Sequence, residues 1–297
     1  MREFSSVIEA VKDCFGAQIE IKKRLPVSGG DINEAYCLML SDGGRVFLKA
    51  NRRESIGFFR TEAEGLRAIR STGAIQTPEL LSLGTEENRS FLLLSFVETG
   101  RPQRDFFEDF GRRLAGMHAA DTESFVSGGK YGFFQDNYIG AGPQKNEPRD
   151  SWISFFREMR LFPQIERASR YFSPTEREAF EWLLSHLDQF LTEPKAPALL
   201  HGDLWGGNFM TGADGTAWLI DPAAYVGHPE ADLAMTELFG GFSADFYRGY
   251  YEVSPKEPGY EIRREIYNLY HLLNHLNLFG GGYLSSVRRV LSKLHDG

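Results

Sequence analysis

One short segment of the chain combines the residue types that phosphoryl transfer requires. His201, Asp203 and Asn208 follow the pattern H-x-D-x-x-x-x-N, and Asp221 comes 13 residues after the asparagine. Such transfer depends mostly on positioning and on neutralising charge. A carboxylate such as Asp203 can take the proton of an attacking hydroxyl, and the oxygens of Asn208 and Asp221 can hold Mg²⁺ against nucleotide phosphates. The residues from His201 to Asp203 could also be a plain turn, and Asp221 could merely end a strand. The joint order and spacing of the two parts favour phosphoryl transfer.

A cation for the nucleotide phosphates lies upstream. Lys49 ends a strand-like segment, and Glu62 lies on the helical pattern over 56–70, from which a carboxylate can hold that ammonium in place. Glu64 is the competing partner, but it lies about 200° around the helix from Glu62, so both cannot face Lys49. A lysine at a strand end is often only a surface residue. Together with the H-x-D pattern, we interpret Lys49 as the phosphate-binding cation.

Two further segments are candidates for nucleotide binding. The first, between strand-like segments, consists of Ser28, Gly29 and Gly30. It stands where a phosphate-covering turn belongs, but it is not G-x-G-x-x-G, and a plain glycine hairpin fits it equally well. The second consists of Phe96, Val97 and Glu98. Its backbone N–H and C=O groups could bind an adenine edge, and it also fits a simple linker.

A helical pattern over 261–280 indicates a substrate site. Its apolar residues form one narrow stripe, made of Ile262, Ile266, Leu269, Leu273 and Leu276. Beyond the first turn, the opposite face lacks Lys and Glu. That face carries Tyr267, His271, Asn274 and His275. Neutral donors, acceptors and rings suit the wall of a polar pocket such as a sugar site, although an exposed or interface-packed face fits too. Metal binding by His271 and His275 lacks an acidic third ligand and an H-E-x-x-H pattern.

Three residues around the loop have supporting roles in this interpretation. Trp205 is a large ring beside the proposed base, where it can stack on the C–H face of a sugar or anchor the core. Asp232 lies in the first turn of a predicted helix. Its carboxylate can bond the loop backbone and hold it, or merely add charge to that turn. We expect His201 to support the loop as well.

The elements that must position these residues divide the chain into two parts. Strand patterns occur in the first hundred residues, at 18–25, 34–40, 45–50, 79–83 and 91–97. Met1 to Gly16 has the pattern of an amphipathic helix, and helical patterns dominate from Phe107 onward. We therefore predict an α+β, bilobal fold. A small antiparallel-sheet N-terminal lobe spans 1–98, and a larger, mainly helical C-terminal lobe spans 99–297.

Composition narrows the class of protein. The 297 residues are 42% hydrophobic and carry a net charge of −8, which argues against a nucleic-acid partner. Only two cysteines occur, Cys14 and Cys37, as in proteins of a reducing compartment. Charged residues interrupt the start of the chain, so it does not resemble a signal peptide, and no apolar run is long enough to span a membrane. We expect a soluble, cytoplasmic protein; the sequence does not indicate its oligomeric state.

Taken together, the motifs resemble those of the fructosamine/ketosamine-3-kinase family, relatives of aminoglycoside and choline kinases. The similar segments span nearly the whole chain: Val46–Lys49, Tyr131–Phe133, His201–Asn208 (HGDLWGGN), Asp221–Ala223, Gly227–Glu230, Leu238–Phe242, Leu269–His275 and Phe279–Gly281. HGDLW with the later FGGF is far more specific than H-x-D-x-x-x-x-N. One departure is Asp31, where family members often carry another residue, in some cases Cys.

The resemblance implies a protein-kinase-like fold and ATP-dependent, Mg²⁺-assisted phosphorylation of the sugar 3-hydroxyl of a ketoamine. The product is unstable and frees the amine, which amounts to deglycation of a small sugar-amine or a glycated protein. The implied roles are a base (Asp203), phosphate positioning (Lys49, Glu62), Mg²⁺ ligands (Asn208, Asp221), a hinge (Phe96 to Glu98) and a sugar site (Trp205, His271 and either Asn274 or His275).

Three other functions compete with this one. Aminoglycoside or choline-type kinases bind cationic substrates, which favour an acidic pocket, whereas the late helix offers His, Asn and Tyr. A protein kinase needs a long activation segment, but only ten residues separate Asp221 from Asp232. A catalytically dead nucleotide-binding module would have lost a catalytic acid or the phosphate-binding lysine, and neither is missing.

Overall fold

The computed structural model describes residues 3–27 and 33–295, so the predicted glycine turn at Gly29 and Gly30, and Asp31, lie outside the described residues. A six-stranded sheet comes first, in the order β1-β5-β6-β4-β3-β2. Its strands are β1 (Glu3–Phe4), β2 (Ile21–Pro26), β3 (Glu34–Leu40), β4 (Arg45–Arg52), β5 (Leu80–Glu86) and β6 (Arg89–Ser95). Neighbouring strands are antiparallel, except that β1 runs parallel to β5.

The start of the chain differs from the expected single helix. Glu3 and Phe4 form β1, and helix α1 (Val7–Phe15) begins only after Ser6. The hydroxyl of Ser6 accepts a hydrogen bond of 3.1 Å from the backbone N–H of Glu9, which caps the helix. This cap separates a short strand from an amphipathic helix that is about two turns shorter than the sequence pattern suggests.

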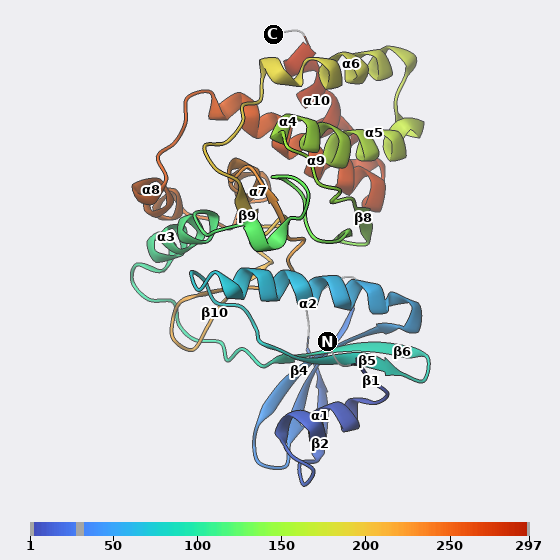
Figure 1. Cartoon of the computed structure of the whole chain (residues 1–297), viewed down its shortest axis with the longest axis vertical. Coiled ribbons are helices and arrows are strands. Elements are labelled where there is room, and N and C mark those ends of the chain that lie inside the picture. Colours follow the sequence, from blue (N-terminus) through green and yellow to red (C-terminus); the bar gives the residue numbers. More distant parts are fainter. Residues whose placement is uncertain (1–2, 28–32, 296–297) are drawn as a thin grey trace.

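The sheet lies between two helices, α1 and α2 (Ile56–Ser71) (Figure 1). Side chains alternate across a strand, and in β6 this alternation separates two cores. Phe91 and Leu93 pack in the cluster that holds α1, whereas Leu92 and Leu94 pack in the cluster that holds α2. The same alternation in β4 buries Leu48 on the α1 side and leaves its neighbour Lys49 on the side of α2.

Helix α2 also contacts the second part of the molecule, and Figure 1 shows it between the sheet and the remaining helices. Its residues Ala68 and Ile69 belong to the large second core. A Cβ at Gly65 would lie 3.0 Å from the ring of Pro222, the residue after Asp221. The face of α2 toward the sheet and the face toward Asp221 therefore belong to one rigid element.

Helices dominate the part that follows the sheet. They are α3 (Phe106–His118), α4 (Trp152–Phe155), α5 (Phe162–Ala168), α6 (Pro174–Ser185), α7 (Glu230–Leu238), α8 (Ala244–Val253), α9 (Tyr260–Phe279) and α10 (Leu284–His295). Three two-stranded ladders lie among them: β7 (Asn137–Ile139) with β8 (Gly142–Gln144), β9 (Ala198–Leu200) with β12 (Tyr225–Gly227), and β10 (Phe209–Thr211) with β11 (Ala217–Leu219). The architecture is the predicted α+β arrangement of a small sheet lobe and a larger helical lobe.

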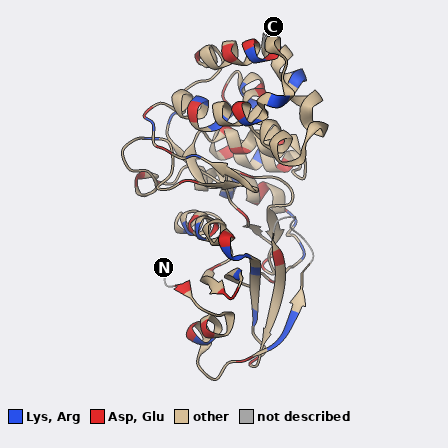
Figure 2. Cartoon of the chain, turned by 90° about the vertical axis from the view of Figure 1, so that its right-hand side faces the viewer, with Lys and Arg blue, Asp and Glu red and all other residues tan. Residues whose placement is uncertain are grey.

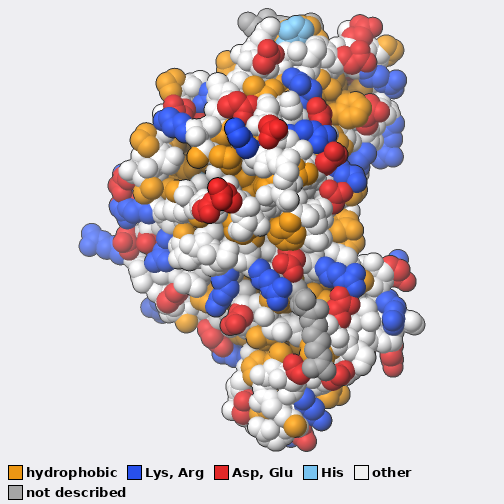
Figure 3. Space-filling view, viewed as in Figure 1, with side chains coloured by type: hydrophobic (Ala, Val, Ile, Leu, Met, Phe, Trp, Pro, Cys, Tyr) orange, Lys and Arg blue, Asp and Glu red, His pale blue; other side chains and the backbone are white. Residues whose placement is uncertain are grey.

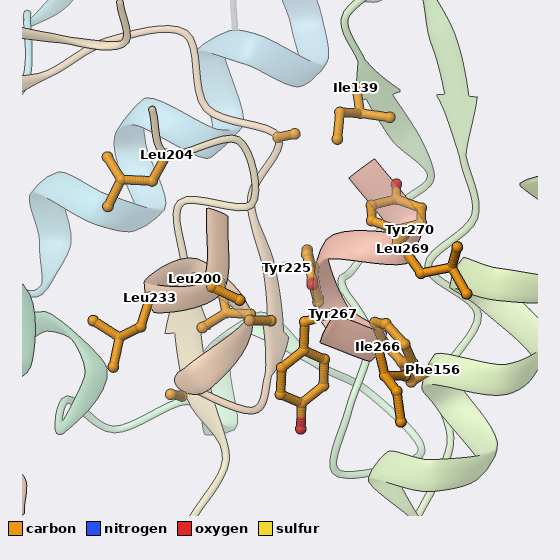
Figure 4. Close-up of a cluster of buried hydrophobic side chains, with 14 of the residues drawn as sticks. Ile139, Phe156, Leu200, Leu204, Tyr225, Leu233, Ile266, Tyr267, Leu269 and Tyr270 are labelled. Atoms are coloured by element: carbon orange, nitrogen blue, oxygen red, sulfur yellow. The ribbon is translucent and has the colours of Figure 1, made fainter. Parts of the chain in front are cut away.

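The core of the helical lobe surrounds the paired strands β9 and β12, and β9 leads directly into the H-x-D pattern. Figure 4 shows Leu200 of β9, Tyr225 of β12 and Leu233 of α7 in one cluster with Tyr267 and Tyr270 of α9. All five side chains are 2% exposed or less. The loop that follows β9 therefore starts from a rigid base.

The connection between the lobes is paired with the helical lobe. The N–H of Gly100 donates to the carbonyl of Thr211 at 3.1 Å, and the N–H of Gln103 donates to the carbonyl of Gly215 at 3.1 Å. The sheet ends at Ser95 and α3 begins at Phe106. The predicted boundary between residues 98 and 99 falls in this connection and stays a prediction.

Charged side chains of both signs are interspersed over both lobes (Figure 2), and the face in Figure 3 shows the same mixture with hydrophobic groups scattered among them. Within residues 3–27 and 33–295, no helix combines the length and apolar composition that crossing a membrane requires. Cys14 is exposed and Cys37 is buried, and both are free thiols.

Candidate active site

Residues 201–208, termed the catalytic loop, join β9 to β10. The carboxylate of Asp232 holds the start of this loop. Asp232 of α7 accepts hydrogen bonds from the backbone N–H groups of His201 (2.7 Å) and Gly202 (2.8 Å). Gly202 has φ +80°, and a Cβ there would lie 2.1 Å from the carbonyl oxygen of Ala223, so only glycine fits. The predicted support by Asp232 is thus present in the geometry.

His201 connects the catalytic loop to the chain before Asp221. Its ring Nε2 lies 2.9 Å from the carbonyl oxygen of Ile220, which can only accept, so this nitrogen carries the proton. Nδ1 then accepts from the backbone N–H of Asp203 at 3.3 Å. Burial lowers the pKa of His201, in keeping with a neutral ring. His201 therefore fixes the backbone of Asp203 against that of Ile220.

Asp203 and Asn208 form the predicted pair within the loop. The Nδ2 group of Asn208 donates to the backbone carbonyl of Asp203 at 2.8 Å and to its carboxylate at 3.2 Å. Burial raises the pKa of Asp203 to about 7, and Asn208 opposes this shift. A carboxyl group with this pKa can accept a proton near neutral pH.

Lys49 joins the two lobes. Its ammonium donates to the carboxylate of Glu62 on α2 at 2.7 Å and also pairs with the carboxylate of Asp221. Burial alone would lower the pKa of Lys49, but Asp221 and Glu62 together raise it, so the side chain is a cation. Glu64 instead pairs with Arg67. The choice of Glu62 over Glu64 is confirmed.

Asp221 has an unusual backbone conformation for a residue other than glycine. Its φ is +54°, in the left-handed region, where the backbone of residues other than glycine is strained. The N–H of Ile220, the preceding residue, donates to the carbonyl of Asn208 at 3.0 Å. This turn brings the carboxylate of Asp221 to Lys49 while the backbone stays tied to the catalytic loop.

The donor set of the site suits Mg²⁺. Because the amide nitrogen of Asn208 is engaged with Asp203, its Oδ1 remains an oxygen acceptor, and Asp221 supplies carboxylate oxygens. Proteins commonly hold Mg²⁺ through one or two such side chains together with substrate phosphates. No group of three or more His, Cys, Asp or Glu side chains arranged for a metal occurs among the described residues. An amide oxygen and a carboxylate of this kind fit a metal that is bound together with nucleotide phosphates.

The predicted hinge lies at the end of β6. Glu98 pairs with Arg45 of β4, and the guanidinium of Arg45 lies 4.8 Å from the ring centre of Phe96. Val97 between them is buried. These contacts fix the backbone of the segment next to the sheet, while adenine binding by residues 96–98 stays a prediction.

The sugar-site candidates occupy two different environments. Trp205 is 41% exposed, and its ring covers Gly207, where a Cβ would lie 2.4 Å from the ring. The core-anchor alternative for Trp205 is therefore wrong. His271 and Asn274 are 4% and 2% exposed, and the amide of Gln164 on α5 donates to Asn274 Oδ1 at 3.2 Å.

The face of α9 opposite the apolar stripe thus lies in the interior instead of on an open wall. The reason is that α9 packs against α5, α7 and α10 and is covered on several sides. Tyr267 accepts a hydrogen bond of 3.1 Å from Trp152, whereas Ile262, assigned to the buried stripe, is 48% exposed. His275 is only partly buried. Contact of His271, Asn274 or His275 with a substrate stays a prediction.

Sequence reasoning missed a second layer of support beneath Asp232. His118 at the end of α3 lies with Nε2 3.2 Å from Asp232 Oδ2 and Nδ1 2.8 Å from the hydroxyl of Tyr250 on α8. Since a carboxylate accepts, Nε2 of His118 is the donor to Asp232. The available signal was a histidine on the apolar face of a predicted helix, which more often marks an ordinary core residue.

Comparisons with known proteins agree with this geometry. The family model described as fructosamine kinase matches residues 3–296. A probable ketoamine kinase from Synechocystis sp. is 40% identical over 292 residues, which cover 98% of this chain and 96% of that protein. A crystal structure of a putative fructosamine-3-kinase from Haemophilus somnus has a TM-score of 0.85 and 29% identity, and covers 97% of this chain and 96% of its own.

A more distant neighbour shows how widely the fold is used. An aminoglycoside phosphotransferase, in a ternary complex with ADP and hygromycin B, superimposes with a TM-score of 0.65 at 16% identity and covers 97% of this chain and 96% of its own. This likeness establishes the fold alone, which is the protein-kinase-like one. By its match to the family model and its 40% identity to a ketoamine kinase, the chain belongs to the fructosamine kinase family.

Proposed function

We propose that this protein is an ATP-dependent kinase that phosphorylates the sugar 3-hydroxyl of ketoamines of the fructosamine or ribulosamine type. One observation carries the proposal. The cation Lys49, held by Glu62, meets the carboxylate of Asp221, and the backbone ties Asp221 to the loop with Asp203 and Asn208. The residues proposed for phosphate binding, metal binding and proton acceptance therefore lie together in one site.

Nucleotide binding is assigned to both lobes. Lys49 supplies the positive charge for the α- and β-phosphates, and residues 96–98 offer backbone groups to the adenine. Asn208 and Asp221 would hold Mg²⁺, which neutralises charge on the phosphates when it is bound. In the described structure Lys49 pairs directly with Asp221. We expect this pair to separate as phosphates draw Lys49 away.

Asp203 takes the part of the base. Its carboxylate accepts the proton of the 3-hydroxyl while the oxygen forms a bond to the γ-phosphorus and the bond to the ADP oxygen breaks. The Nδ2 group of Asn208 fixes the orientation of the carboxylate. The raised pKa, about 7, matches proton transfer at neutral pH.

The substrate is placed against Trp205, whose exposed ring can stack on the C–H face of the sugar. His271, Asn274 and His275 are proposed to form the polar side of the sugar site. The 3-phosphate is unstable and releases the amine, so the outcome is deglycation of a small sugar-amine or a glycated protein. The free thiols Cys14 and Cys37 are consistent with action in a reducing cytoplasm.

A direct test identifies the oxygen that is phosphorylated. Purified protein is incubated with Mg²⁺, ATP and a 1-alkylamino-1-deoxyfructose, and the fresh product is examined by phosphorus–proton correlation NMR. We expect a correlation from the new phosphorus to H3 of the sugar, followed by release of the amine. Phosphorus on any other sugar oxygen would refute the assigned position.

A further inference from the structure

Four rings near the end of α9 form a connected group, and only one of them, His275, already has a place in the proposed sugar site. We term this group the aromatic rim; its members are Phe239, His275, Phe279 and Tyr283. The ring centre of His275 lies 4.6 Å from that of Phe239, 5.4 Å from that of Phe279 and 5.1 Å from that of Tyr283. Phe279 is 60% exposed and Phe239 is 37% exposed. Exposed apolar groups that gather in one patch are a common mark of a binding surface.

The aromatic rim is continuous with the active site. Gly240 and Gly241, which follow Phe239, pack against Gly206 of the catalytic loop, and a Cβ at Gly241 would lie 2.7 Å from the Cα of Gly206. Trp205, the residue before Gly206, is another exposed ring. The catalytic loop, which carries Asp203 and Trp205, therefore contacts the segment that starts with Phe239 of the rim.

The chemistry of the rim suits a cation with an apolar chain. His275 Nδ1 lies 2.8 Å from the carbonyl oxygen of His271, so Nδ1 carries a proton and Nε2 is left as an acceptor. Burial lowers the pKa of His275, which keeps the ring neutral at pH 7. Among the described residues, no Lys or Arg side chain stacks on a ring of the rim. Those that stack on rings lie on Tyr36, Phe96, Phe155, Tyr171, Tyr225, Tyr260 and Tyr270.

A ketoamine has the matching chemistry. Its nitrogen sits on C1, two carbons from C3, and is a protonated secondary amine near neutral pH. Aromatic faces attract such an ammonium, and their apolar surface accommodates methylene groups attached to it. We propose that the aromatic rim binds the alkylammonium part of the substrate, with His275 Nε2 as acceptor, and so selects N-alkylated ketoamines over free ketoses. This inference rests on the proposed function and adds residues and a substrate class to it.

The test compares two substrates that differ only in the chain on nitrogen. ADP release is measured with the N-methyl and N-pentyl derivatives of 1-amino-1-deoxyfructose, and again with the same two derivatives of 1-amino-1-deoxyribulose. We expect wild-type protein to favour the N-pentyl compound in kcat/KM, and Phe279→Ala to lower this preference about tenfold through a higher KM. Phe279→Tyr, which retains a ring, should preserve the preference. The matched control is Ile262→Ala, because Ile262 is an exposed apolar residue of α9 outside the rim.

The possible outcomes distinguish the role of the rim from the proposed ketoamine kinase activity. Phe279 is largely exposed, so its truncation leaves the fold intact, and Tyr283→Ala provides an independent second variant. An unchanged N-pentyl preference in both variants, with active wild-type protein, would overturn the role of the rim and leave ketoamine phosphorylation standing. Turnover of none of these compounds by wild-type protein, on either sugar, would overturn the proposed function, and the role of the rim with it.

Discussion

The ammonium of Lys49 donates a hydrogen bond of 2.7 Å to the carboxylate of Glu62, across the interface between β4 and α2. Both side chains are largely removed from solvent, at 10% and 13% exposure. The pair links the strand that carries the phosphate-binding cation to the helix that packs on Pro222. Its integrity therefore decides where Lys49 points.

Removing the carboxylate at position 62 should misplace Lys49. In Glu62→Gln the ammonium keeps only Asp221 as an anionic partner and is drawn toward the proposed metal site. We expect kcat/KM for ATP to fall on the order of 10- to 100-fold. Glu64→Gln is the matched control, since Glu64 lies on the same helix and pairs with Arg67. Steady-state kinetics with varied ATP measures both, and equal values for the two variants would contradict the role of Glu62.

The pH dependence of the reaction should report Asp203. Because burial raises the pKa of this carboxyl to about 7, the fraction able to accept a proton grows as pH rises through 7. We expect kcat/KM for the ketoamine to show an acid limb with a midpoint near 7. Measurement from pH 5.5 to 8.5 tests this, and a flat profile over that range would rule out Asp203 as the base.

The same shift has a consequence for stability. A carboxyl whose pKa is higher in the folded than in the unfolded state favours folding below its unfolded pKa, and this contribution is lost as pH rises toward 7. Asp203→Asn should therefore be more stable than wild type at pH 8, by on the order of 1 kcal/mol, and the gain should vanish near pH 4. Thermal unfolding at both pH values measures it. A variant less stable at pH 8 would contradict the burial argument.

Support of the catalytic loop should extend to Tyr250. Its hydroxyl is hydrogen-bonded to Nδ1 of His118 at 2.8 Å, and Nε2 of His118 donates to Asp232. In Tyr250→Phe, His118 loses this partner, and we expect kcat to fall several-fold while KM for ATP stays constant. Tyr251→Phe on the same helix is the control. Loss of kcat in both variants, or in neither, would show that this chain of hydrogen bonds does not position the loop.

Local patterns were enough to predict much of the site. Lys49 and Glu62 could be paired because strand alternation and helical angle both act over a few residues. The burial of His271 and Asn274 could not be predicted from the sequence. An apolar stripe indicates one packed face of a helix, but it does not indicate the neighbours that cover the other sides. His118 was missed because its partner Asp232 lies 114 residues away. The parallel partner of β1 is likewise distant, in β5.

Asp203 is proposed to act as the base in phosphate transfer from ATP to a ketoamine. The most direct measurement is ADP release by wild type and Asp203→Asn with ribulosamines, fructosamines, free sugars, choline and aminoglycosides. We expect ADP release with the ketoamines in wild type, at least about 100-fold less in Asp203→Asn, and none with the free sugars, choline or aminoglycosides. Release with choline or aminoglycosides alone, or full activity of Asp203→Asn, would contradict this proposal.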